Sequence, residues 1–270
     1  MRITFIGGGN MASALIGGLL KRGGDAAEIS VVELQPDGRE RLARDFGVRA
    51  IEAPDAEAMR CDLLVLAVKP QQMREVCAGL APNLNTQTVL SIAAGLRAAD
   101  LSRWLGGHSR IVRAMPNTPA LIGQGVTGLY ADASVSAAER MQAEQVLAAV
   151  GSTVWVGDEK LIDAVTALSG SGPAYVFYFI EAMVRGGEDL GLTADQARAL
   201  AIATFTGASA LAAQSTESPA TLRERVTSKG GTTEAALKSM AADGVGDSIV
   251  RALAAAAARG AELGDQLGAA

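Results

Sequence analysis

A glycine-rich turn close to the N-terminus constrains this chain more than any other feature of its sequence. The segment Gly7–Ala12 fits the pattern G-x-G-x-x-A and directly follows the apolar run Ile3–Ile6. A strand that enters such a turn and leaves it as a helix is typical of a dinucleotide site, because the helix N-terminus offers N–H donors and the positive end of its dipole to phosphates. Gly7 permits the tight turn, Gly9 lets a pyrophosphate approach the backbone, and Ala12 allows close packing of helix on strand. The alternative is a structural glycine turn without a nucleotide.

Apolar strands alternate with helical segments through the first half of the chain. The periodicity predicts strands over Ile3–Gly7, Ile29–Glu33, Asp62–Val68, Thr88–Ile92, Arg110–Ala114, Val126–Tyr130 and Thr153–Val156. Helices are predicted between them over Met11–Arg22, Arg39–Phe46, Gln71–Leu80, Leu101–Trp104 and Ala137–Ala149. Because the strands are apolar nearly throughout, we expect a parallel sheet covered by helices on both faces. This is the doubly wound, Rossmann-type arrangement of the α/β class.

Strand signals disappear after residue 158, and only helical patterns follow. Helices are predicted over Glu159–Ala167, Ala174–Leu190, Ala194–Gln214, Pro219–Val226, Thr232–Ala242 and Asp247–Leu267. Thr193 and Gln196 have the spacing of a capping box, and Gly191 marks a helix end just before it. We therefore expect a dinucleotide-binding domain over residues 1–158 and an all-helical domain over residues 159–270. Helices this apolar need a partner surface, so we expect the second domain to form a dimer interface.

The composition argues against several classes of partner. The net charge is −5 and no basic stripe is present, which argues against nucleic acid. The longest uncharged stretch, Ala199–Thr216, is diluted by hydroxyl and glycine residues, so it is more typical of a buried or interface helix than of a membrane span. The N-terminus lacks the pattern of a signal peptide, so we expect a cytoplasmic protein with Cys61 and Cys77 reduced and no metal site.

An acidic residue follows the second predicted strand. Glu33 lies about 20 residues beyond the glycine turn, where an acid usually accepts hydrogen bonds from the adenosine ribose and disfavours a 2′-phosphate. This favours NAD over NADP. However, Gln35, Arg39 and Arg41 lie close behind and are available for a phosphate if Glu33 turns away. Glu33 is alternatively a solvated strand end.

Two further loops follow strand ends, where ligands bind in open α/β sheets. Ala67–Pro70 places Lys69 at the edge of the expected crevice, where it either contacts the cofactor or is a surface charge. Met115–Pro119 holds Asn117 and Thr118 between two prolines that stiffen the loop. This second loop is either part of the site or an ordinary turn.

Two segments rich in glycine and hydroxyl groups open helices in the second half. Ser169–Tyr175 carries Pro173 in the expected first turn and Ser171 as a candidate cap. Ser228–Thr233 combines glycines with hydroxyls before a helix, which is the arrangement of an anion site. A carboxylate would fit there, held by N–H groups and threonine hydroxyls. Each segment is alternatively only a capped helix start.

The single histidine is not placed for catalysis. His108 lies between glycines and a serine in an expected surface turn, so the usual acid–base histidine of a dehydrogenase is missing. The chemistry should therefore not need a strong general base. Reduction of an iminium ion fits, because the positive nitrogen already activates the carbon toward hydride.

Five segments together resemble pyrroline-5-carboxylate reductase, the enzyme family of the last step of proline biosynthesis. They are FIGGGNMA (Phe5–Ala12), LAVKP (Leu66–Pro70), MPNTP (Met115–Pro119), DAVTALSGSGPAY (Asp163–Tyr175) and TSKGGTT (Thr227–Thr233). The resemblance implies hydride transfer from NADPH to the imine carbon of 1-pyrroline-5-carboxylate, which gives L-proline. It also implies a homodimer through the C-terminal helices, with a decamer as a further expectation.

The resemblance also implies the residues of the site. It implies contacts to the cofactor from Ile6, Gly7, Gly8, Gly9, Asn10, Met11, Ala67, Val68, Lys69, Pro70 and Asn117. Glu33 and Gln35 are added to these cofactor contacts from their position after the second predicted strand. The substrate carboxylate is expected at Gly230, Gly231 and Thr232, and the Thr233 hydroxyl is expected to hydrogen-bond the ring nitrogen. Ser171 is expected to line the substrate pocket, so Thr233 and Ser171 are the candidate catalytic residues.

Two positions depart from the family's pattern. Lys229 stands where many members have proline, and it either adds positive charge near the carboxylate or points to solvent. Glu33 replaces the small polar or basic residue that often meets the 2′-phosphate, so NADH is an alternative to NADPH here. Two other functions stay open from the residues alone. One is a 3-hydroxyacid or prephenate-type dehydrogenase, and the other is a nucleotide-binding protein without enzymatic activity.

Overall fold

The computed structural model describes residues 1–269 and contains two compact units. Unit 1 comprises Met1–Ser171 together with the C-terminal segment that begins at Ala255, and unit 2 comprises Gly172–Ala254. The last strand ends at Trp155, shortly before the expected boundary at residue 158. Unit 1 nevertheless continues through the following helix to Ser171. The functional division into residues 1–158 and 159–270 stays a prediction.

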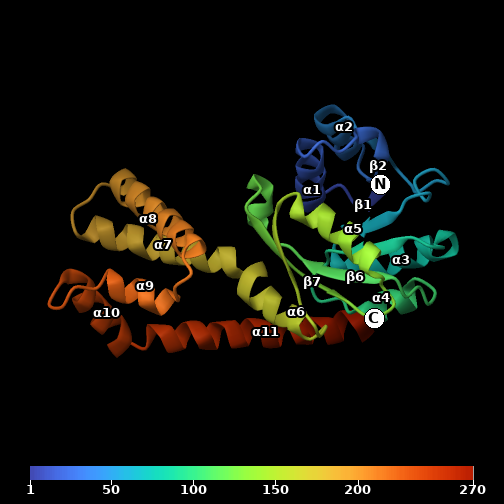
Figure 1. Ribbon diagram of the computed structural model, residues 1–270. Coiled ribbons are helices and arrows are strands. Elements are labelled where there is room, and N and C mark those ends of the chain that lie inside the picture. The colour runs from blue at the N-terminus through green and yellow to red at the C-terminus, as the bar shows by residue number, and fades with distance from the viewer. Residues whose placement is uncertain (270) are drawn as a thin grey trace. The chain divides into compact units, whose positions relative to one another are not determined.

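Unit 1 is built on a sheet of eight strands in the order β3-β2-β1-β4-β5-β6-β7-β8. Figure 1 shows this sheet with helices around it and labels β1, β2, β6 and β7. The strands are β1 (Ile3–Ile6), β2 (Ile29–Val32), β3 (Arg49–Ile51), β4 (Leu63–Leu66), β5 (Thr88–Ser91), β6 (Ile111–Met115), β7 (Gly125–Ala131) and β8 (Gly151–Trp155). Strands β1 to β6 pair in parallel, β6 and β7 pair antiparallel, and β7 and β8 pair in parallel. The expected α/β class and doubly wound sheet are confirmed.

Helices cover both faces of this sheet. They are α1 (Asn10–Lys21), α2 (Pro36–Phe46), α3 (Met73–Leu80), α4 (Ala98–Trp104), α5 (Ala137–Ala148) and α6 (Leu161–Val165). Helices α1, α2 and α5 bury their apolar sides with one face of the sheet, whereas α3 and α4 bury theirs with the other. Successive strand residues point to opposite faces, so Phe5 joins the first cluster and Ile6 the second. Two fully apolar faces explain why the strands read as continuous hydrophobic runs.

Two features of the sheet differ from the sequence-based expectation. The expected parallel sheet has an antiparallel strand, β7, because residues 116–124 are too few for the crossover that a parallel neighbour needs. They instead form a short 3₁₀ turn, η4 (Thr118–Ile122), that reverses the chain. Strand β3 was not predicted, since Arg49–Ile51 is short and only half-buried at the sheet edge.

Unit 2 consists of helices only. It contains α7 (Gly172–Asp189), α8 (Ala194–Gln214), α9 (Pro219–Arg225), α10 (Thr232–Ala242) and the first part of α11 (Val245–Ala269). The capping box is confirmed, because the Thr193 hydroxyl accepts from the Gln196 N–H and the Gln196 side chain accepts from the Thr193 N–H. The helix end at Gly191 is also confirmed by its positive φ of 97°. Among residues 1–269, no helix has the length and apolar character to span a membrane.

Candidate functional site

The turn between β1 and α1 has the geometry that its glycines predict. Gly7 has a φ of 100°, and a Cβ built on it would lie 2.8 Å from the Ala67 carbonyl oxygen. Any other residue would therefore be strained and would collide with the neighbouring strand end. Gly9 begins α1, and a Cβ there would meet no atom within 4 Å. Gly7 is thus required by the fold, whereas Gly9 faces open space that a ligand can approach.

The first turn of α1 offers a row of hydrogen-bond donors. Gly9 provides no side-chain cap, and Ala12 is buried against the sheet as predicted. The backbone N–H groups of residues 9–12 have no protein partner among residues 1–269, since the first helical bond runs from Ser13 N–H to the Gly9 carbonyl. Unpaired N–H groups and the positive end of the helix dipole together suit a phosphate. This end of α1 therefore fits the pyrophosphate of a dinucleotide.

Glu33 is built into the same turn. Its Oε2 accepts from the Gly8 N–H at 2.9 Å, and its Oε1 accepts from the Gln35 N–H at 2.9 Å. Gly38 leaves room for the side chain, because a Cβ there would lie 2.8 Å from Glu33 Cγ. A carboxylate with two such bonds still has lone pairs for further donors. The acid is therefore held at the glycine turn, where its charge faces whatever binds there.

The arginines behind Glu33 are committed to the backbone of unit 1. Arg39 donates from Nη1 to the carbonyl oxygens of Glu33 at 2.9 Å and Leu34 at 2.7 Å. Arg41 donates to the Gly8 carbonyl at 2.8 Å and to Ser13 Oγ at 3.1 Å. The sequence left open that these arginines bind a phosphate if Glu33 turns away. In the structure the Glu33 side chain points to the glycine turn, and both arginines donate to backbone oxygens around that turn.

The loop after β4 adjoins the glycine turn. The Ala67 N–H donates to the Ile6 carbonyl at 2.9 Å, so the ends of β1 and β4 are directly linked. Val68 packs partly buried against an apolar cluster, whereas Lys69 is exposed and its side chain has no bonding partner among residues 1–269. The structure thus brings Ile6–Met11, Glu33 and Ala67–Pro70 to one edge of the sheet.

Asn117 acts as a structural cross-link at the end of β6. The side chain is only 8% exposed. Its Nδ2 donates to the Ser169 carbonyl at 3.1 Å, and its Oδ1 accepts from the Val126 N–H at 2.9 Å. Both ends of the amide are therefore used within unit 1. Asn117 fastens the Ser169–Ser171 segment to the sheet, and any role toward a nicotinamide stays a prediction.

Ser171 directly precedes α7, which begins at Gly172 with Pro173 in its first turn as expected, but Ser171 does not have the backbone of an N-cap, which corrects the expected cap. A π-helix, η5 (Thr166–Gly170), continues α6, and the Ser171 N–H donates to the Thr166 carbonyl at 2.8 Å. Ser171 has a φ of −82° and ψ of −18°, which is helical and unlike the extended backbone of an N-cap. Gly170 allows this close fit, because a Cβ there would lie 2.5 Å from Met115 Cε. Widened turns of this kind occur often at functional sites.

In unit 2, the Ser228–Thr233 segment forms a turn that opens α10. Gly230 has a φ of 74°, and the Gly231 N–H donates to the Ser228 carbonyl at 3.0 Å. The N–H groups of residues 232–234 have no protein partner among residues 1–269, and neither does the Thr233 hydroxyl. Free N–H groups at a helix N-terminus suit an anion, and binding of a carboxylate here stays a prediction.

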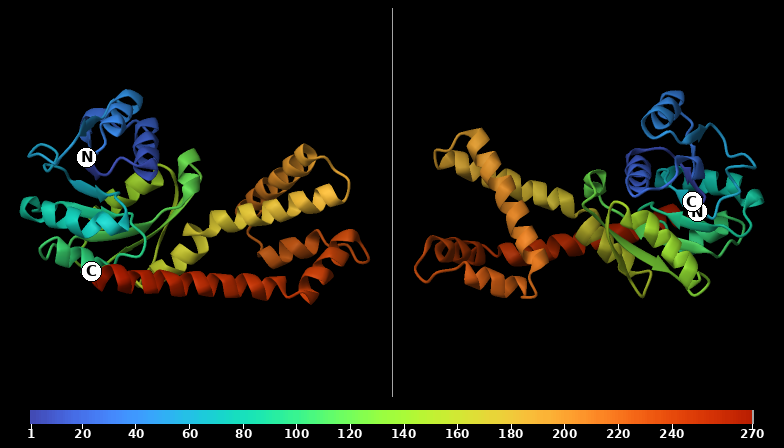
Figure 2. Two further views of the ribbon diagram at one scale, coloured as in Figure 1. Left: turned by 180° about the vertical axis from the view of Figure 1, so that it is seen from behind. Right: turned by 45° about the horizontal axis from the view of Figure 1, so that its top comes forward.

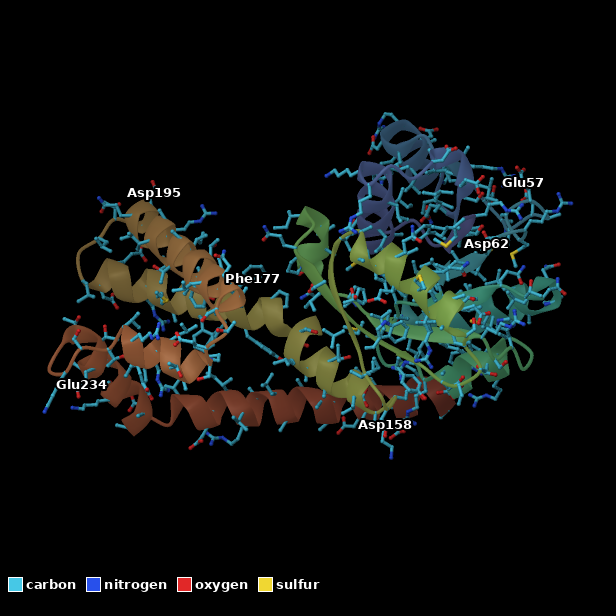
Figure 3. All side chains as sticks on the ribbon, viewed as in Figure 1. Glu57, Asp62, Asp158, Phe177, Asp195 and Glu234 are labelled. Carbon is cyan, nitrogen blue, oxygen red and sulfur yellow. The ribbon has the colours of Figure 1, made fainter. Side chains whose placement is uncertain are left out.

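One residue of this turn was missed by sequence reasoning. Glu234, labelled in Figure 3, accepts from the Gly230 N–H at 2.6 Å and pairs with Lys238 Nζ at 3.1 Å. Donation from Gly230, together with Lys238, holds the pKa of the Glu234 carboxyl below its usual value. Gly230, predicted to bind substrate, thus already donates to Glu234, which leaves residues 232–234 as the free donors. Lys229 is exposed.

Unit 2 buries little of its own apolar surface. Its buried apolar side chains among the described residues are Ala197 and Ala201, whereas Phe177 is 65% exposed. A pocket of about 290 Å³ lies between α7 and α11, lined by residues that include Tyr175, Tyr178, Phe179, Val245, Ile249 and Leu253. Large exposed apolar surfaces mark interaction sites.

Known proteins match this chain over nearly all of its length. A family model described as pyrroline-5-carboxylate reductase dimerisation matches residues 159–263, and one described as NADP oxidoreductase, coenzyme F420-dependent, matches residues 2–95. Pyrroline-5-carboxylate reductase of Pseudomonas aeruginosa is 50% identical over 268 residues, with 99% of this chain and 98% of the relative covered. The enzyme of Haemophilus influenzae is 42% identical over 266 residues, with 97% of each covered.

Solved structures of the same family have the same fold. A pyrroline-5-carboxylate reductase from Coxiella burnetii superposes with a TM-score of 0.93 at 41% identity, over 97% of this chain and 98% of that one. The Plasmodium falciparum pyrroline carboxylate reductase with NADP bound gives 0.85 at 27% identity, over 98% of both chains. With its glycine turn, its hydroxyl-rich helix start and these relatives along its full length, the chain belongs to the pyrroline-5-carboxylate reductase family.

Proposed function

We propose that this chain reduces the C=N bond of 1-pyrroline-5-carboxylate to give L-proline, with hydride from a reduced nicotinamide nucleotide. The observation that carries the proposal is the start of α10, where free N–H groups stand beside an unpaired threonine hydroxyl. A small cyclic imino acid needs both, one for its carboxylate and one for its ring nitrogen. Family membership supports the same reaction.

Each part of the site has a role in this reaction. The first turn of α1 holds the pyrophosphate, and the Ala67–Pro70 loop and Asn117 lie on the cofactor side. When bound, the reduced nicotinamide supplies the hydride. The N–H groups of Gly231 and Thr232, with Thr233, hold the substrate, and Ser171 lines its pocket. The Gly231 N–H donates to the Ser228 carbonyl and must break that hydrogen bond to reach the substrate. The Thr232 N–H has no protein partner among residues 1–269.

The chemistry needs no histidine. The hydride adds to the carbon of a protonated imine, the C=N π electrons move onto nitrogen, and the nitrogen keeps its proton as it becomes an amine. Thr233 orients that nitrogen through a hydrogen bond. His108 does not take part, since its Nε2 donates to the Gln87 carbonyl at 2.9 Å in the loop before β6. A hydrogen bond to a charged group contributes about 1.5–3 kcal/mol, which is the scale of effect expected from Thr233.

The cofactor preference follows from Glu33. The resemblance implies NADPH, but Glu33 places a carboxylate at the glycine turn and the nearby arginines are engaged with backbone oxygens. A 2′-phosphate would meet that carboxylate, whereas a ribose hydroxyl can donate to it. Gln35 and Lys69 are two further residues that we expect to contact the cofactor. We propose that NADH serves at least as well as NADPH.

The assembly is a homodimer through the helices of unit 2, with a decamer as a larger possible form. The support is the apolar surface of α7 and the pocket between α7 and α11, which a single chain leaves uncovered. A cytoplasmic location fits the two free, buried cysteines. Light scattering of the purified protein measures the number of chains directly.

The function is tested by turnover. Purified protein with 1-pyrroline-5-carboxylate should oxidise NADH or NADPH, and no turnover with either would contradict the proposal. Thr233→Ala should lower kcat roughly 10- to 100-fold, because the hydrogen bond to the ring nitrogen is lost. Thr233→Ser should retain most of the rate, and Ser239→Ala on the exposed part of α10 is the matched control. Activity with 2- or 3-hydroxy acids instead would point to a dehydrogenase of another specificity.

A further inference from the structure

The end of α11 packs closely on the rest of unit 1. Its buried residues are Gly260, Gly264 and Gly268, which recur every four positions and share one helix face. A Cβ on Gly264 would lie 3.0 Å from the Gly95 carbonyl oxygen, and one on Gly268 would lie 2.4 Å from Asp100 Oδ2. The glycines therefore let the helix approach closer than a larger residue would allow.

This helix end holds one particular loop, residues 92–97, which joins β5 to α4. Arg97 donates to Asp265 at 2.6 Å, and Arg103 on α4 donates to the Gly268 carbonyl at 2.5 Å. Leu267 packs partly buried against the cluster that contains Leu96. Figure 2 shows the C-terminal end of α11, in red, lying against the strand-containing part of the chain. The loop is thus fixed by steric fit, an ion pair, a helix-end hydrogen bond and apolar packing.

The same loop is linked to the edge of the sheet where the cofactor residues gather. The Ile92 N–H donates to the Leu66 carbonyl at 3.2 Å, directly before the Ala67–Pro70 loop. Ala67 in turn bonds to the end of β1, and Val68 packs on the same apolar cluster as Leu267. A continuous set of contacts therefore runs from α11 through the β5 and β4 loops to the glycine turn.

We propose that the segment Gly260–Ala269 positions the β5–α4 loop for binding of the nicotinamide nucleotide, with Gly264 as its central positioning residue. Carboxyl ends of parallel strands form the ligand edge of a doubly wound sheet, and β5 lies next to β4 in that edge. A loop at this place needs to be held rigidly, because a misplacement of about 1 Å costs on the order of 10²-fold in a reaction that depends on orientation. The proposal rests on the nucleotide-binding role proposed above.

The test compares Gly264→Val with Gln266→Val, which places the same residue on an exposed position of the same helix. The branched side chain at residue 264 must push the helix away from Gly95, so the Kd and KM for NADH should rise roughly tenfold or more. The KM for the imino acid should stay near the wild-type value, a split that general destabilisation would not give. Gly264→Ala, with a single methyl at the same contact, should show a smaller rise.

The outcomes separate the two proposals. If the wild-type protein binds neither NADH nor NADPH, the proposed function fails. If wild-type binds and both folded variants at Gly264 keep a Kd within roughly twofold of the Gln266→Val control, the positioning role is wrong. A lower Tm with an unchanged Kd would also assign Gly264 a structural role only. Should Gly264→Val not fold, Gly264→Ala decides by the same comparison.

Discussion

At the scale of single residues, Glu33 is held in one position beside the glycine turn. Its two carboxylate oxygens accept from Gly8 and Gln35, and Gly38 makes the space it occupies. The charge is therefore fixed in position, not mobile on the surface. A fixed negative charge acts on a 2′-phosphate by repulsion and on a ribose hydroxyl as an acceptor.

Glu33→Gln should relax the cofactor preference. It removes the charge and keeps one carbonyl oxygen, so the ratio of kcat/KM for NADPH to that for NADH should rise, by roughly tenfold. Glu33→Ser should raise the ratio further. Glu40→Ser, which removes an exposed acid on α2, is the control. A ratio that does not change in either Glu33 variant would remove Glu33 from the specificity of this site. The measurement is initial rates with both nucleotides at saturating imino acid.

Residues whose role follows from local backbone geometry could be predicted from the sequence. Gly7 has a positive φ in the turn between a strand and a helix. The sequence pattern of such a turn covers only a few neighbouring residues, so it can be recognised without knowing the fold. Arg41 could not be assigned to the Gly8 carbonyl, because they are separated by more than thirty positions and meet only after folding. Glu234 was missed for a different reason. Its carboxylate accepts the hydrogen bond from the Gly230 N–H, a donor that the glycine pattern alone predicts to bind the substrate.

At the scale of elements, helix α8 depends on its N-terminal cap. Thr193 and Gln196 satisfy each other's backbone N–H groups, and α8 has otherwise little buried surface in unit 2. Thr193→Ala should therefore lower the free energy of unfolding by about 1 kcal/mol. Thr204→Ala makes the same change in the exposed middle of α8, where the hydroxyl bonds only its own helix, and should be close to neutral. Urea unfolding of both variants at equal protein concentration checks this, and equal losses would contradict it.

Most elements of unit 1 follow from hydrophobic periodicity, but the exceptions have physical reasons. Strand β7 is antiparallel because the connection before it is too short for a crossover, whereas its apolar pattern alone predicts a parallel strand. The π-helix before Ser171 cannot be seen in a sequence pattern, since its residues Thr166–Gly170 suit an ordinary helix end equally well. In the folded chain, Gly170 at the end of this π-helix lies so close to Met115 that a Cβ on it would meet the Met115 side chain.

At the scale of the whole molecule, stability should depend on pH through the single histidine. Burial lowers the pKa of His108 below its ordinary value of 6.5. The unfolded chain therefore binds a proton at a pH where the folded chain does not, so stability is complete above about pH 6.5 and falls as pH drops toward the folded pKa. Other side chains titrate mainly outside this range. Melting curves from pH 7 to 5.5 should show a falling Tm, and His108→Gln should flatten that slope. An equal slope in the variant would contradict the assignment.

The path of the chain through the two units has a consequence for biosynthesis. Unit 1 is discontinuous: the chain leaves it after Ser171, builds unit 2, and returns only at Ala255 to pack Leu267 and Gly264 against residues 92–97. Domains generally fold as units while the N-terminal part emerges first from the ribosome. Here the strands of unit 1 are synthesised before unit 2, and α11 returns to unit 1 only after unit 2 has been made. The apolar contact surface of Leu267 on unit 1 is therefore exposed on the nascent chain until α11 has been synthesised.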